Sequence, residues 1–147
     1  MATWAEFSGQ APELAEKGAA LFARSGDEAL LATVREGEPP RIHPVTVGLR
    51  GGGLFVFLHP SSKSADLQSD GRYALHAYMD PAAPDEFAIR GRARPVRGDR
   101  RAELAASWPW HVGPEVHGFE LMLDEVVLGQ RGSDEWPPRY STWNSDR

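Results

Sequence analysis

The sequence predicts a mainly β protein, a small antiparallel barrel with flanking helices. Strand patterns outnumber helix patterns, the turns between strands are short, and the series of strands is first interrupted by a helix only after the third strand. This order suits a barrel better than a βαβ sheet. The 147 residues are about one domain in length. We therefore expect a single domain over 1–147, with the barrel over about 29–130 and a tail over 131–147.

An amphipathic helix is expected first, over about 12–24. The segment PELAEKGAALFAR places its apolar residues at helical spacing, and Pro12 and two acids occupy the first turn, where proline and negative charge are favoured.

Three strand patterns follow, and turn residues separate them. EGEPP ends the first pattern, and GGG at 51–53 separates the second from the third. The expected strands are 29–35, 41–50 and 54–58. The third, LFVFL, is apolar on both faces, so one face must fill the core while a helix or a second subunit covers the other. A homodimer would supply that cover.

Further elements complete the chain. A short helix is expected from Ser61 or Ser62, and in the strand 87–96 the side chains of Arg90, Arg92 and Arg94 share the face opposite the apolar residues. The remaining expected elements are a strand over 72–78, a helix over 99–108 and a last strand or strand pair over 118–129.

Composition excludes several classes of function. The formal charge of −5 argues against a nucleic-acid partner, and no apolar stretch approaches the length of a membrane span. The chain has no cysteine, its histidines lack metal-ligand spacing, and the first residues lack the pattern of a signal peptide. We therefore expect no metal site and a cytoplasmic location.

The segment HPSSK, at the start of the short helix, combines a cap with a cation. Either serine can cap the helix, and Lys63 adds positive charge where the helix dipole is already positive. A phosphate bound there would turn this small cost into a gain. Spacing alone leaves two interpretations open, an anion site and a solvated helix start.

The segment from about Ala29 to Val96 resembles the FMN-binding split-barrel family related to pyridoxamine 5'-phosphate oxidase. The resemblance rests on the order of its signals, LATVREGEPPRIHPVTVGLRGGGLFVFLHPSSKSADLQSDGRYALHAYMD followed by FAIRGRARPV. In that family a Pro-Val-like strand end, a glycine turn, a second apolar strand and a Ser-Lys helix start occur in this order, and a strand with a Gly-x-Ala element closes the barrel.

The resemblance implies a split antiparallel β-barrel, FMN as cofactor, and a homodimer with cofactor sites at its interface. It implies that Lys63 binds the FMN phosphate together with a serine, that Arg41 is a second phosphate ligand, and that 44–46 lies against the flavin ring. The implied cofactor-binding residues are Arg41, Pro44, Val45, Thr46, Leu58, His59, Ser61, Ser62 and Lys63. Trp110, His111 and Trp143 are weaker candidates for covering the cofactor.

The expected function is that of an FMN-dependent oxidoreductase acting on a small molecule. The basic cluster of pyridoxamine-phosphate oxidase cannot be located in this chain, so we do not expect that activity itself. Two alternatives remain: an F420-dependent reductase, with the arginine row holding the anionic tail of that cofactor, and a flavin- or haem-binding carrier or sensor without turnover.

Overall fold

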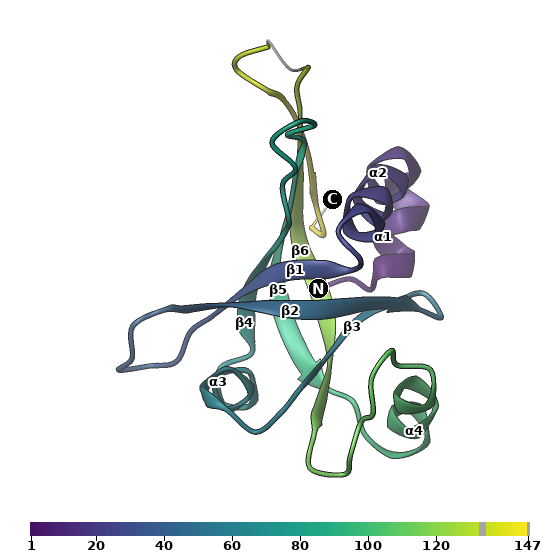
Figure 1. Ribbon diagram of the computed structural model, residues 1–147, viewed down its shortest axis with the longest axis vertical. Coiled ribbons are helices and arrows are strands. Elements are labelled where there is room, and N and C mark those ends of the chain that lie inside the picture. The colour runs from purple at the N-terminus through teal and green to yellow at the C-terminus, as the bar shows by residue number, and fades with distance from the viewer. Residues whose placement is uncertain (133–134, 147) are drawn as a thin grey trace.

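The computed structural model describes residues 1–132 and 135–146, in which six antiparallel strands form a closed barrel (Figure 1). The strands follow the order β3–β2–β1–β4–β5–β6, and pairing of β3 with β6 closes the barrel. A further strand, β7, pairs with β6. The strands are β1 Glu28–Thr33, β2 Arg41–Arg50, β3 Gly53–Leu58, β4 Arg72–Ala77, β5 Glu86–Pro95, β6 His117–Gln130 and β7 Arg139–Asn144. The helices are α1 Trp4–Gln10, α2 Pro12–Arg24, α3 Ser62–Ser69 and α4 Gly98–Ala106.

The antiparallel barrel expected from the sequence is confirmed. The expected helix over 12–24 coincides with α2, and the helix expected from Ser61 or Ser62 begins at Ser62 with Ser61 as its cap. Two elements were not expected, namely α1 near the N-terminus and β7 in the tail. Residues 133, 134 and 147 of the expected tail lie outside the described residues.

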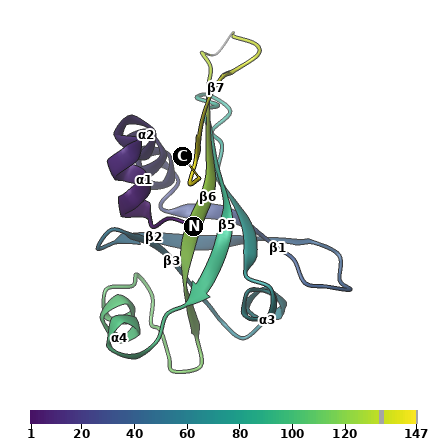
Figure 2. The same ribbon diagram turned by 180° about the vertical axis from the view of Figure 1, so that it is seen from behind.

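The main core fills the barrel and continues beneath α1 and α2, which lie together beside it (Figure 1). Aromatic rings join the helices to the sheet, with Phe22 of α2 packed edge-to-face on Phe87 of β5. Gly18 makes this contact possible, because a Cβ there would lie 2.2 Å from Cζ of Phe87. The two helices are thereby fixed to the barrel wall, and α3 and α4 lie on opposite sides of the other half (Figure 2).

A second hydrophobic cluster covers the outer face of β3. Phe55 and Phe57 point away from the main core and pack with Leu104 of α4 and Trp108, which follows it. Phe57 and Trp108 meet edge-to-face with ring centroids 4.9 Å apart. A helix of the same chain therefore covers the doubly apolar strand, and its apolar character no longer argues for a second subunit.

In the described part of the chain, no helix is both long enough and apolar enough to span a membrane. The same residues contain no group of three or more histidine and acidic side chains placed to hold a metal ion.

Candidate functional site: a cavity where two barrel strands part

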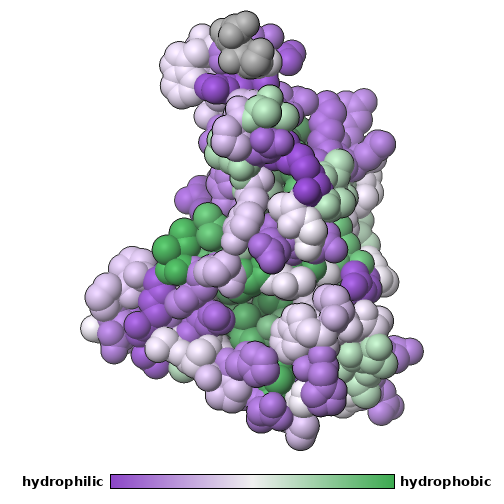
Figure 3. All heavy atoms as spheres, viewed as in Figure 1, coloured by the Kyte–Doolittle hydropathy of each residue, from purple (hydrophilic) through white to green (hydrophobic). Residues whose placement is uncertain are grey.

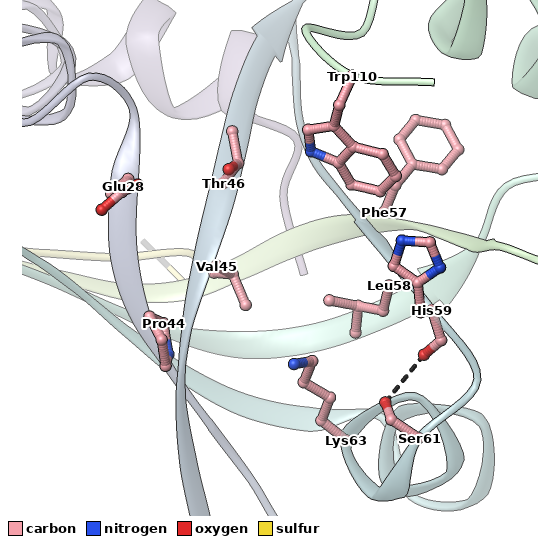
Figure 4. A pocket seen from close by; sticks show the side chains of 10 residues that line it. All are labelled: Glu28, Pro44, Val45, Thr46, Phe57, Leu58, His59, Ser61, Lys63 and Trp110. Carbon is pink, nitrogen blue, oxygen red and sulfur yellow. Dashed lines mark hydrogen bonds between the residues drawn. The ribbon is translucent and has the colours of Figure 1, made fainter. Parts of the chain in front are cut away.

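The candidate site lies where β2 and β3 separate. Only Val47–Arg50 of β2 pair with β3, and the last two residues of β3, Phe57 and Leu58, pair with β6 alone. The first half of β2 therefore has a ladder partner on one side only, β1. Beside this unpaired edge is a cavity of about 360 Å³, a volume typical of small-molecule sites. Its lining residues are Glu28, Pro44, Val45, Thr46, Phe57, Leu58, His59, Ser61, Lys63 and Trp110 (Figure 4).

The structure brings together most of the residues that the resemblance implies. In the space-filling view, a hydrophobic area lies below β2, between α3 and the part of the chain that contains α4 (Figure 3). The implied residues that line the cavity are Pro44, Val45, Thr46, Leu58, His59, Ser61 and Lys63. Arg41 and Ser62 are not among the lining residues, while Glu28 and Phe57, which sequence reasoning did not select, are.

The start of α3 forms the cationic end of the cavity. Ser61 caps the helix by accepting a hydrogen bond from the Ser64 amide at 3.4 Å, and Ser64 Oγ accepts one from the Ser61 amide at 2.9 Å. Lys63 is half-buried and its ammonium points into the cavity (Figure 4). No carboxylate of the described residues lies within 4.0 Å of this ammonium. The cavity therefore has a positive charge available to an anion.

Arg41 is held behind the helix by a buried carboxylate. Its Nε donates to Asp66 Oδ2 at 3.0 Å, and the same oxygen accepts a hydrogen bond of 2.8 Å from the Thr33 hydroxyl. Arg35 forms a third contact with Asp66, at 3.3 Å. Asp66 thus joins α3 to β1 and β2, a role that sequence reasoning missed because its partners are distant in the chain.

His43 stands on β2 between Arg41, which belongs to this ion-pair cluster, and Pro44, which lines the cavity. Its Nε2 atom is buried and has no hydrogen-bond partner among the described residues. Burial, and then the positive charges of Lys63 and Arg41, lower the pKa of the imidazole, against a smaller opposing effect of Asp66. The histidine therefore adds no positive charge to this region at neutral pH.

The strand edge along the cavity offers backbone groups to a ligand. Pro44, Val45 and Thr46 pair with Leu30, Ala29 and Glu28 of β1 on one side only. Pro44 has no N–H, so any backbone donors on this edge belong to its neighbours. A flat ligand with hydrogen-bonding groups at its rim suits such an edge.

Aromatic side chains form the wall opposite Lys63. The rings of His59 and Trp110 are stacked, with centroids 5.2 Å apart and planes 19° apart. Of the weaker candidates, only Trp110 lines the cavity. Trp143 is buried against Phe7 and donates to Gln10 Oε1, and His111 is exposed in its loop.

The expected arginine row is present on the outer face of β5, and its alternation with buried residues is confirmed. Carboxylates hold two of its members, because Arg90 pairs with Glu125 and Arg94 with Glu120. Arg92 has no carboxylate partner within the described residues and lines a separate outer cavity of about 460 Å³.

Comparisons with known proteins show the fold. No protein-family model and no curated protein sequence matches this chain. Among solved structures, a protein related to general stress protein 26 from Clostridium acetobutylicum, of the pyridoxinephosphate oxidase family, has a TM-score of 0.67 at 14% identity and covers 90% of this chain and 94% of its own. A FAD-binding protein from Mesorhizobium loti has a TM-score of 0.60 at 13% identity, with 76% and 90% covered. A haem-binding protein from Mycobacterium smegmatis has a TM-score of 0.64 at 22% identity, with 88% of this chain and 57% of that chain covered. The fold is thus that of the pyridoxamine 5'-phosphate oxidase-like split barrels.

Proposed function

We propose that this chain binds FMN in the cavity between β2 and β3 and acts as an FMN-dependent oxidoreductase on a small molecule. The observation that carries the proposal is Lys63, a half-buried ammonium that points into the cavity beside the start of α3 without a carboxylate partner among the described residues. A phosphate group complements both the ammonium and the unpaired amides of a helix start. The FAD-binding and oxidase-family proteins of the same fold add support.

The lining of the cavity offers possible partners for both the phosphate and the ring of FMN. Lys63 and Ser61 would hold the phosphate, and the unpaired edge at 44–46 would meet the polar rim of the flavin, with Leu58 and His59 beside it. Arg41 and Ser62 remain proposed as outer phosphate ligands, although Arg41 Nε is engaged by Asp66. When bound, a flavin would supply hydride or electron transfer, and the residues of this chain would hold and orient it.

The test compares two ligands that differ only in the phosphate, FMN and riboflavin, by titration calorimetry. The parent should bind FMN more tightly, and Lys63→Ala should weaken FMN binding by about 1 to 3 kcal/mol, the range for a charge-assisted hydrogen bond. Riboflavin affinity should stay unchanged. The matched control is Lys17→Ala, which removes the other lysine of the chain from an exposed position on α2. Equal FMN affinity in the parent and Lys63→Ala would refute the phosphate site.

A second candidate function is haem binding without turnover. It is favoured by the exposed His59 imidazole at the cavity, since histidine is a common axial ligand of haem iron, and by the haem-binding protein of the same fold. Adding haemin, FMN or F420 separately and recording visible spectra separates these candidates. A Soret band that is lost in His59→Ala would favour haem. If the protein bound F420 but neither haemin nor FMN, the proposed site would instead be the row of Arg90, Arg92 and Arg94, which would hold the anionic tail of F420.

We propose further that the chain forms a homodimer through the outer face of β1, β2 and β4. Ile42 and Met79 there are 66% and 48% exposed, and both line an outer cavity with Leu30. This face adjoins the cofactor cavity, because Glu28 and Pro44 lie on the same strands. Ile42→Glu should convert a dimer to a monomer in sedimentation velocity, whereas Ala106→Glu on exposed α4 should not. A monomeric parent would contradict the proposal.

A further inference from the structure

The aromatic wall of the cavity is held from two independent directions. His59 follows β3 directly, and its carbonyl accepts a hydrogen bond of 2.9 Å from the Ser61 hydroxyl, so the helix cap also fixes the chain at His59. Trp110 belongs to the loop between α4 and β6. The stacked rings of His59 and Trp110 therefore join two segments that are far apart in sequence.

The loop that carries Trp110 is anchored on both sides. Trp108 is buried in the second cluster, and Gly48 makes room for it, because a Cβ at Gly48 would lie 2.4 Å from Cζ3 of Trp108. Arg101 donates to the carbonyls of Gly113 and Val116 at 2.9 and 2.7 Å. The loop around Trp110 is therefore held in place by its neighbours, while the Trp110 side chain itself is only half-buried.

The charge and the aromatic surface lie at different ends of the cavity. Figure 4 shows Lys63 at the α3 end, with Trp110, His59 and Phe57 on the wall away from it. Aromatic rings favour offset or edge-on contact with another flat ring, an advantage that a saturated ring does not share. No other cation lines this cavity within the described residues.

From this arrangement we propose that His59 and Trp110 are specificity-determining residues that bind the flat ring of an aromatic substrate. The substrate class is a planar ring compound that is uncharged or weakly charged. That the bound compound is a substrate rests on the proposed function. The preference for a flat ring is a property of His59 and Trp110 themselves and can be measured with or without FMN.

The experiment titrates the full chain, with and without saturating FMN, with two uncharged probes of equal size. One is 1,4-naphthoquinone, which is flat, and the other is a saturated, non-planar bicyclic diketone. The parent should bind the flat probe about fivefold more tightly than the saturated one, as expected for one aromatic stacking contact. Trp110→Ala and His59→Ala should each remove this preference, and Trp110→Phe should retain most of it.

Three controls keep the outcomes distinct. Trp136→Ala removes a tryptophan that is 78% exposed and outside the cavity, and it should change nothing. Lys63→Ala should lose FMN affinity but keep the preference for the flat probe. Thermal melting verifies that each variant is folded, and His59→Ala tests the wall from a different segment if Trp110→Ala does not fold. A parent that does not distinguish the probes, or an unchanged preference in folded Trp110→Ala or His59→Ala, would overturn the inference. Loss of FMN binding alone would overturn only the proposed function.

Discussion

Replacing Asp66 should destabilise the protein far more than replacing other acids near the same arginines. The Asp66 carboxylate is fully buried and holds the Thr33 hydroxyl at 2.8 Å and Arg41 Nε at 3.0 Å. Thr33 is also fully buried, so its hydroxyl would be left without this acceptor at a cost of about 1 to 3 kcal/mol. Arg35 and Arg41 are 32% and 26% exposed and can turn to water, so each lost ion pair adds only about 0 to 1 kcal/mol.

The expected loss of unfolding free energy for Asp66→Ala is therefore about 3 kcal/mol, measured by urea denaturation. Asp66→Asn keeps one acceptor and should lose about 2 kcal/mol. The control is Glu38→Gln, because Glu38 is 45% exposed and lies 3.8 and 3.7 Å from the same two arginines. It should cost less than about 0.5 kcal/mol. If Asp66→Asn were no more destabilising than Glu38→Gln, the assignment of Asp66 as the anchor of α3 would be wrong.

Two further predictions concern a histidine and a glycine. Because burial and nearby positive charge lower the pKa of His43 below its unfolded value of 6.5, unfolding free energy should fall as pH drops through the window below 6.5. His43→Gln should reduce that slope in urea titrations at several pH values; an unchanged slope would contradict the lowered pKa. Gly91→Ala should cost about 3 kcal/mol or more, since its Cβ would collide with the backbone carbonyl of Met122, whereas Gly9→Ala meets no atom within 4 Å and should not destabilise. Similar melting temperatures for the two glycine variants would refute this packing argument.

Strand and turn chemistry made most of the barrel predictable from sequence. Glycine and proline at 37–40 and 51–53 mark the turns, and β2 was expected over the same residues that it occupies. The helix α1 was not predicted because it has only seven residues, of which Trp4 and Phe7 alone are buried. The strand β7 was not predicted because two prolines precede it and Trp143 is its only buried residue. Short elements with one or two buried residues have too weak a period to be recognised.

The cavity itself was less predictable than its residues. It exists because only the last four residues of β2 pair with β3, so that Phe57 and Leu58 have β6 as their one ladder partner, and no local sequence pattern records where such pairing stops. Phe57 is one example, since an apolar residue in a strand gives no sign in the sequence that it will line a ligand-sized cavity. Asp66 is another, because its two hydrogen-bonding partners lie 33 and 25 positions earlier.

Lys63 is the residue for which sequence and structure argue together. The helices α1, α2 and α4 each carry an acid in the first turn, as the helix dipole favours, whereas α3 has none and carries a lysine there. Helix stability alone would favour an acid at that position, by a few tenths of a kcal/mol. The capping box of Ser61 and Ser64 holds the helix start without help from a negative side chain, which leaves the ammonium free to point into the cavity. A phosphate at this place would supply the negative charge that the first turn of α3 lacks, and the difference between FMN and riboflavin affinities measures that contribution directly.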